Sequence, residues 1–391
     1  MGIDISLTQI EKDFLWDLAC NRHDDAKHHF SKIKCHKNLI FYAMNNRLEI
    51  HLENFLKKEG LINRIEPSLI NNFYLSLENR VKRNFAINQK ALNLLDEYSQ
   101  NKINYSVLKG LSYTSISRKF NRTLRDIDVL IARDDIGKAV KIANKHGFQF
   151  KNHIQFSENM ILDESKVYDL PDLIDKNKIC LEIHYKIFRE SRITPCALSD
   201  IILDNKLEYQ FFDKTIYGSS PAIALVHLIY HATKKGNFDV GLTAIFDYFF
   251  LLDYISNTDK DLVFEITSNF GLIKEAEIFF LLQKENISEE ESKKMDIFKN
   301  LIFSINANTN IQSLFQDTNK FRVMKSLLKM VFVNKRELNR EFNIQPEKGF
   351  IMYYFKRWVR QIIQFRYLIY LLVFKRNRFK EKSKLIDEFY L

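Results

Sequence analysis

The chain of 391 residues is long enough for two or three domains with a large hydrophobic core. Hydrophobic residues make up 46% of it and only 10 Gly and 5 Pro interrupt it, which excludes low-complexity disorder and favours a helix-rich globular protein. The formal net charge of +10 is concentrated in residues 321–391, which hold 17 Lys and Arg against 6 Asp and Glu, so any attraction to phosphate or lipid head groups belongs to that segment.

Cysteine usage and the first residues indicate the compartment. The cysteines show no CxxC pair and no His at zinc-ligand spacing, so we expect reduced thiols, no disulfide and no structural metal from Cys20, Cys35, Cys180 and Cys196. The first residues, MGIDISLTQIEKDF, lack the basic and apolar regions of a secretory signal. We therefore expect a cytoplasmic protein, which the basic C-terminal segment could hold peripherally at a membrane surface.

Helical periodicity dominates residues 5–100. Apolar side chains recur there every three or four residues, as in LINNFYLSLENRVKRNFAINQKALNLLDEY, and Gly60 and Pro67 interrupt the pattern. Short β-branched runs follow from about residue 103: INYSVLKG, RDIDVLIA, FQFK, KICLEIHYKIF and LEYQFFDKTIYG, with a helical stretch, RDDIGKAVKIANKHG, between the second and the third. This alternation predicts an α/β or α+β core.

A second helical part begins near residue 220, after a break at SRITPCALSD and the last β-run. Ser219 or Ser220 can cap a helix whose first turn contains Pro221, and Gly236 can end it. Helical periodicity then continues to the end of the sequence. We predict four parts: a helical region over 1–100, a mixed core over 101–215, a helical acceptor-side domain over 216–320 and a basic, aromatic helical region over 321–391.

Two carboxylates stand one residue apart in a predicted strand. In RDIDVLIA, Asp126 and Asp128 point to one face and Ile127 and Val129 to the other, because side chains alternate along a strand. A divalent cation would turn the repulsion between two such carboxylates into ligation. Glu182, in KICLEIHYKIF, alternates with apolar neighbours in the same way. These three acids could hold Mg²⁺ or Mn²⁺ for phosphoryl or nucleotidyl transfer, with Glu182 as the candidate base for the acceptor's proton.

A Lys-Gly pair precedes the acidic strand. Lys109 and Gly110 end INYSVLKG at a predicted turn into a helix, where Gly110 would let the backbone approach a phosphate and Lys109 would offset its charge. Arg122 and Arg125 flank the acidic pair. Either could hold a triphosphate, and Arg125 could equally be an ordinary solvated residue at a strand edge. These four residues are the candidates for nucleotide binding.

In combination, these motifs resemble a bacterial family of uncharacterised nucleotidyltransferases in the DNA polymerase β superfamily. The likeness rests on LKG, an Arg four residues before an Asp-hydrophobic-Asp, a helix ending in HGF and a LEIHY strand, and it covers roughly residues 105–280. The Lys-Gly pair stands where the superfamily usually has Gly-Gly or Gly-Ser. The segment LVHLIYHATKKGNFDVGLTAIFDYFFLLDYI is also similar to the family's helical tail.

The resemblance implies a fold and a site. The fold is α+β: a small mixed β-sheet core flanked by helical N-terminal and C-terminal regions. By this likeness the nucleotide and metal site comprises Lys109, Gly110, Arg122, Asp126 and Asp128. Glu182 matches the third acidic position of the family, and His184 follows it as the family's pattern expects.

Three further residues, His184, His231 and Asp247, are candidates for the acceptor side. His184 could act in the site or be a histidine satisfied within the core. His227 and His231 lie at i and i+4 on one predicted helix face, and a structural or acceptor-pocket role is favoured over metal binding because no third ligand is evident. Asp247 stands among aromatic residues and needs a partner, and we predict a hydrogen bond to His231.

The predicted function is Mg²⁺-dependent transfer of a nucleotidyl group, with ATP as the favoured donor, to a hydroxyl of a small molecule or glycan precursor, with release of pyrophosphate. Transfer to RNA, such as tRNA, or to a protein side chain is the first alternative. A non-catalytic nucleotide-binding or assembly module is the second. The basic stretch MYYFKRWVRQIIQFRYLIYLLVFKRNRFK fits a packed helix with a solvated face, a membrane-surface or partner-docking helix, or a nucleic-acid grip.

Overall fold

The computed structural model describes residues 5–117, 122–151, 156–157, 169–187, 197–235, 238, 240–304, 352–355, 358 and 376–390. Four short helices come first: α1 (Gln9–Ala19), α2 (His23–Lys32), α3 (Lys37–Asn46) and α4 (Glu49–Lys58). A capping box starts α1, because the Thr8 hydroxyl accepts a hydrogen bond from the Glu11 amide and the Glu11 carboxylate accepts one from the Thr8 amide. The described part of the first hundred residues is helical, as the periodicity predicts.

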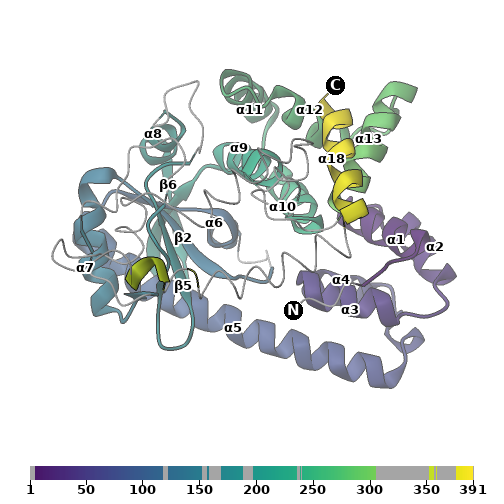
Figure 1. Ribbon diagram of the computed structural model, residues 1–391, viewed down its shortest axis with the longest axis horizontal. Coiled ribbons are helices and arrows are strands. Elements are labelled where there is room, and N and C mark those ends of the chain that lie inside the picture. The colour runs from purple at the N-terminus through teal and green to yellow at the C-terminus, as the bar shows by residue number, and fades with distance from the viewer. Residues whose placement is uncertain are drawn as a thin grey trace.

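One long helix, α5 (Pro67–Gln100), joins these helices to the sheet (Figure 1). It follows a 3₁₀ turn, η1 (Ile62–Arg64), and begins at Pro67, whose fixed φ suits the first turn of a helix. Leu69, in its first half, belongs to the core shared by the helices, whereas Leu95, in its second half, belongs to the core beneath the sheet. Because α5 takes part in both cores, it fixes the N-terminal helices relative to the sheet.

A mixed sheet forms the centre of the described chain. Its seven strands stand in the order β3-β4-β5-β2-β1-β7-β6. The strands are β1 (Tyr105–Val107), β2 (Asp126–Ile131), β3 (Gln149–Phe150), β4 (Leu173–Ile174), β5 (Cys180–His184), β6 (Lys206–Phe211) and β7 (Lys214–Ser219). β2 is parallel to β5 and β1 is parallel to β7, while the other neighbours are antiparallel. The predicted α+β class, with a small mixed sheet and helical flanks, is confirmed.

The two faces of the sheet are covered differently. On one face α5 packs with α7 (Ile136–Lys145), which follows a 3₁₀ turn, η2 (Arg133–Asp135), and the odd-numbered apolar side chains of β2 are buried there. On the other face β2 meets α6 (Lys109–Ile116) and α8 (Ala197–Asp204). α8 corrects the predicted break over residues 191–200, whose first part lies outside the described residues. The face with α6 and α8 is the one that carries the acids.

A second group of helices follows β7. It comprises α9 (Pro221–Tyr230), a π-helical turn η4 (His231–Lys235), α10 (Leu242–Leu252), α11 (Asn257–Asn269), α12 (Ile273–Leu281) and α13 (Glu289–Ile302). The predicted start of α9 is confirmed, because the Ser220 hydroxyl accepts a hydrogen bond from the Ile223 amide and Pro221 is the first helical residue. Gly236, the predicted end, lies outside the described residues. The predicted domain boundary at residue 215 lies within β7. The helices that follow β7 share one hydrophobic core with α1–α4.

The last described helix, α18 (Arg376–Tyr390), packs beside α13 (Figure 1). The Phe389 ring lies 5.2 Å from that of Phe238, and the Lys234 ammonium lies 4.1 Å from the centre of the Tyr390 ring. The end of the basic region is therefore docked on the helical part of the molecule, while most of residues 321–375 lie outside the described residues. In the described part of the chain, every helix is too short or too polar to span a bilayer.

Candidate active site

The acids of β2 and β5 meet across a parallel strand pair. Asp128 is directly opposite Glu182, and Leu130 is opposite His184. Opposed residues point to the same face of a sheet, so the side chains of Asp126, Asp128, Glu182 and His184 share the face that carries α6 and α8. Their odd-numbered neighbours on β2 are fully buried on the other face. The alternation seen in the sequence thus determines which side of the sheet bears the charges.

Lys109 reaches this acidic face from the end of β1. The Leu108 amide donates a hydrogen bond to the Asp128 carbonyl at 3.0 Å, which brings the start of α6 beside the acids. The Lys109 ammonium forms a short ion pair with Asp128 and lies 3.7 Å from Glu182 Oε2. Its backbone has a φ of +50°, in the left-handed region that is uncommon for a residue with a side chain.

His184 completes the group. Its Nε2 lies 2.9 Å from Asp128 Oδ1 and 3.5 Å from Glu182 Oε2, and the ring is buried. Burial alone would lower the pKa of His184, but hydrogen bonds to Asp128 and Glu182 outweigh it, so the pKa is raised above its ordinary value. The imidazolium is therefore stabilised, and it donates to the carboxylates.

The two acids of β2 titrate in opposite directions. Burial acts to raise the pKa of Asp128, but Lys109 and His184 hold it well below its ordinary range, so this carboxylate stays ionised. Burial and the neighbouring Asp128 charge raise the pKa of Asp126 to about 7. Lys109 shows the complementary effect: burial would lower its pKa, but Asp128 and Glu182 raise it. The site therefore holds one permanent carboxylate beside one that can carry a proton near neutral pH.

Two overlapping sets of side chains have the spacing of metal ligands. Asp128, Glu182 and His184 present ligand atoms within 4.8 Å of one another, and so do Asp172, Cys180 and Glu182. Among the described residues, Asp126 belongs to neither set. Carboxylate oxygens are the ligands that Mg²⁺ and Mn²⁺ prefer, so the two carboxylates of the first set, Asp128 and Glu182, fit such an ion, and Glu182 is shared between the two sets.

Asp172 is a site residue that the sequence does not reveal. It directly precedes β4, which has only two residues and leaves no alternating pattern to read. Burial and the Glu182 carboxylate raise the pKa of Asp172, so the residue shares the electrostatic field of the site. The only signal in the sequence is the repeated acid in DLPDLID, which does not specify a strand.

Arg122 lies at the site but points to the helical part of the molecule. Its guanidinium forms a short ion pair with Asp247 of α10, whose carboxyl is buried. The predicted hydrogen bond between Asp247 and His231 is wrong. Asp247 Oδ2 accepts a hydrogen bond from Arg122, and Asp247 Oδ1 has no hydrogen-bond partner in the described chain. Burial raises the pKa of Asp247 to about 6, although Arg122 opposes this shift.

The other predicted residues are His231 and Arg125. His231 is the first residue of η4, and its ring lies 6.2 Å from the His227 ring. Arg125 is exposed, directly before β2, and its charge contributes to lowering the pKa of the neighbouring Arg47. Residues 122–124, which precede Arg125, are held by Asn84 of α5. The Asn84 side chain accepts a hydrogen bond from the Leu124 amide at 2.8 Å and donates one to the Arg122 carbonyl at 2.6 Å.

Gly110 is required by close packing. A Cβ atom at this position would lie 2.8 Å from Leu124 Cδ2 and 3.1 Å from Arg122 Nε. We expect Gly110→Ala to lower the free energy of unfolding by about 1–3 kcal/mol, because a well-packed core accommodates an extra methyl group only by moving its neighbours. Thermal unfolding measures the change. Gly137→Ala in α7 is the matched control: its Cβ would meet only ordinary contacts, and we expect a gain of about 0.5–1 kcal/mol from the better helix propensity. Equal effects of the two substitutions would contradict the close approach at Gly110.

Comparison with known proteins identifies the family. A search of curated proteins finds no match to the chain. The family described as "uncharacterised nucleotidyltransferase" matches residues 36–287, which include α5, the whole described sheet and the helices from α6 to α12. The match covers more than half of the chain and contains every predicted site residue. On this evidence, the chain belongs to the uncharacterised nucleotidyltransferase family.

Proposed function

We propose that this chain transfers the AMP group of ATP to a hydroxyl of a small-molecule acceptor, with release of pyrophosphate and with Mg²⁺ or Mn²⁺ as the cofactor. The observation that carries the proposal is the cluster of Asp128, Glu182 and His184 within 4.8 Å, with Lys109 on the same carboxylates. Membership of a nucleotidyltransferase family supports transferase activity in general. The choice of ATP and of a small acceptor is the part of the proposal that experiment must decide.

The donor set suits a divalent ion. Asp128 and Glu182 would hold it, with Asp126 on the same face as a further carboxylate and His184 fixing the orientation of Asp128. When bound, the ion would polarise the α-phosphate and offset its charge. Lys109 forms an ion pair with Asp128 and would compensate this carboxylate when no ion is bound.

The chain's own residues can perform the remaining steps. The acceptor oxygen forms a bond to the α-phosphorus, the bond from that phosphorus to the pyrophosphate oxygen breaks, and the hydroxyl proton passes to a carboxylate. Glu182 suits the last role, because its side chain is 28% exposed whereas that of Asp128 is 3% exposed. Lys109 and the first amides of α6 would offset the charge of the departing pyrophosphate.

The test is label transfer from each of the four NTPs, labelled at the α-phosphate, to the small-molecule fraction of a lysate. We expect transfer from ATP with stoichiometric pyrophosphate when Mg²⁺ or Mn²⁺ is present, and loss of both products when EDTA removes the ion. Label in the RNA or protein fraction would reassign the acceptor. Binding of NTP without any pyrophosphate release would refute the enzyme and favour a nucleotide-binding module.

A further inference from the structure

The acidic row continues to the edge of the sheet and ends in a lysine. Asp128 is opposite Glu182, and the antiparallel register of β4 with β5 places Asp172 opposite Glu182 on its other side. The register of β3 with β4 then places Lys151 opposite Asp172, and the Lys151 amide donates to the Asp172 carbonyl at 3.1 Å. The four side chains therefore share one face. Neighbouring strands are about 4.8 Å apart, so Lys151 lies on the order of 10 Å from Glu182.

A cavity of about 680 Å³ opens at this edge, a size typical of small-molecule sites. Cationic side chains dominate its lining, and Asp175 is the one acid among the lining residues that the structure describes. The lysines are Lys90 of α5, Lys145 at the end of α7, Lys151 and Lys176, and His146 lies beside them. The α5 and α7 residues come from the face of the sheet opposite the acids, whereas Lys151 lies on the acidic face, so the cavity extends around the β3 edge. A cavity of this composition favours an anion of more than one charge.

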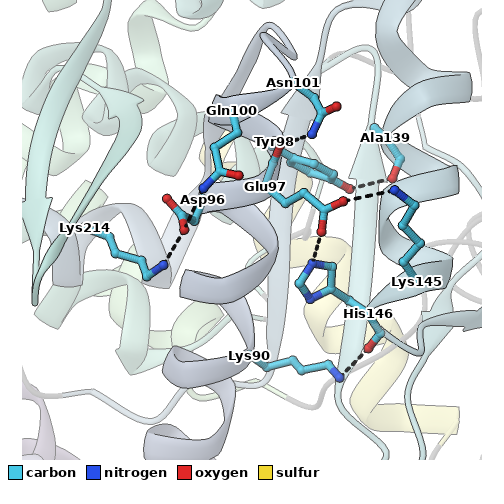
Figure 2. A network of polar contacts seen from close by, with 10 residues as sticks. All are labelled: Lys90, Asp96, Glu97, Tyr98, Gln100, Asn101, Ala139, Lys145, His146 and Lys214. Carbon is cyan, nitrogen blue, oxygen red and sulfur yellow. Dashed lines mark hydrogen bonds and ion pairs between the residues drawn. The ribbon is translucent and has the colours of Figure 1, made fainter.

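Some of these basic side chains already form ion pairs or hydrogen bonds within the protein (Figure 2). Glu97 of α5 lies 3.3 Å from the Lys145 ammonium and 2.7 Å from His146 Nε2, and the Lys90 ammonium donates to the His146 carbonyl. Lys90 also lies 3.6 Å from Asp175, whose other oxygen accepts hydrogen bonds from two backbone amides. The acid in the cavity is thus compensated within the protein.

Lys151 and Lys176 remain available. Both are exposed, and within the described chain neither ammonium has a hydrogen bond or an ion pair closer than 4 Å. Two free ammonium groups at the mouth of a concave site are suited to a phosphate, which accepts hydrogen bonds from several donors at once.

The order of the strands separates this cavity from the nucleotide side of the site. Lys109 and Gly110 follow β1, which neighbours β2 on one side, whereas β5, β4 and β3 lead away from β2 on the other. The acids lie between the two. A donor nucleotide held at the start of α6 would therefore leave the β3 edge free for the second substrate.

We propose that the edge cavity binds a phosphate group of the acceptor, so that the acceptor is a phosphorylated small molecule whose reacting hydroxyl reaches Glu182. This proposal rests on the proposed nucleotidyl transfer for its functional meaning, but the binding itself requires neither nucleotide nor catalysis. Lys151 and Lys176 determine the affinity for the phosphate, and Lys90, Lys145 and His146, which are paired within the protein, form the wall behind them.

The experiment is residue-by-residue lysine acetylation of the full chain, read by mass spectrometry, with inorganic phosphate as the probe and chloride at equal ionic strength as the reference. We expect phosphate to protect Lys151 and Lys176 and to leave Lys138 and Lys141, which are exposed on α7 outside the cavity, unprotected. The double variant K151Q/K176Q should weaken phosphate binding about tenfold, the effect of losing a charge-assisted hydrogen bond. The matched double variant K138Q/K141Q, with the same change of charge, should bind as wild type.

Three results would overturn the proposal: no protection of Lys151 and Lys176 by phosphate, equal weakening by both double variants, or protection of these two lysines by a short RNA but not by phosphate. Because the assay contains no NTP and no metal, it can succeed when nucleotidyl transfer fails, and it can fail when transfer is observed. The failure of this inference is therefore distinguishable from the failure of the proposed function.

Discussion

Asp128→Asn should lower the rate of nucleotidyl transfer by about 10²–10⁴ while almost preserving the volume of the side chain. Asp128 forms the ion pair with Lys109 and lies 2.9 Å from His184. Its carboxylate and that of Glu182 have the spacing of two ligands of one metal ion. The amide cannot supply the negative charge that holds a metal and offsets both cations. The measurement is pyrophosphate release at saturating ATP and metal, together with Mn²⁺ affinity from electron paramagnetic resonance, which reports ion binding without turnover.

Asp134→Asn is the control for this variant. Asp134 is exposed in η2, away from the acidic face, and its neutralisation should leave the transfer rate and Mn²⁺ affinity unchanged. Thermal unfolding of both variants is needed as well, because removing one member of a buried group leaves Lys109 and His184 without their shared counter-ion and lowers stability. An Asp128→Asn protein that is folded and still transfers at the wild-type rate would place the chemistry elsewhere.

Local patterns were sufficient to predict β2 and β5 and the shared face of their acids. β2 has six residues and β5 has five, and in each the acidic side chains alternate with apolar neighbours, so their orientation is readable without knowing their partners. The start of α9 is equally local, because Ser220 and Pro221 act within one helical turn. Where the physical cause lies within a few residues, the sequence contains the information.

Register and long-range pairing could not be predicted in this way. Asp172 and Lys151 enter the row only because β3 and β4, of two residues each, pair in one particular register at the edge of the sheet. Arg122 meets Asp247 across 125 positions of the chain, through the packing of α10. The sequence pattern around Arg122 favours a phosphate contact as well as it favours an ion pair, and only tertiary packing distinguishes the two.

Removing one partner of the Arg122–Asp247 pair should strongly lower stability. Its carboxyl is buried at the junction of α10 with the segment that packs on Gly110. At pH 8, where Asp247 is ionised because its pKa is about 6, we expect Asp247→Ala to lower the free energy of unfolding by about 3–5 kcal/mol, since it leaves a guanidinium that cannot lose its proton without a partner. Thermal unfolding monitored by circular dichroism measures the loss.

Three comparisons determine whether the buried pair is the cause. Arg122→Met should be less harmful at pH 5 than at pH 8. Burial raises the pKa of Asp247 and Arg122 opposes this rise, so without Arg122 the buried carboxyl takes up a proton at a still higher pH and is neutral at pH 5. The double variant R122M/D247L should recover much of the lost stability, since buried ion pairs can be replaced by packed apolar side chains. Glu289→Ala, which breaks an exposed pair with Lys293 on α13, should leave the melting temperature unchanged. If Asp247→Ala and Glu289→Ala have the same effect, the junction is held by its apolar contacts and not by the ion pair.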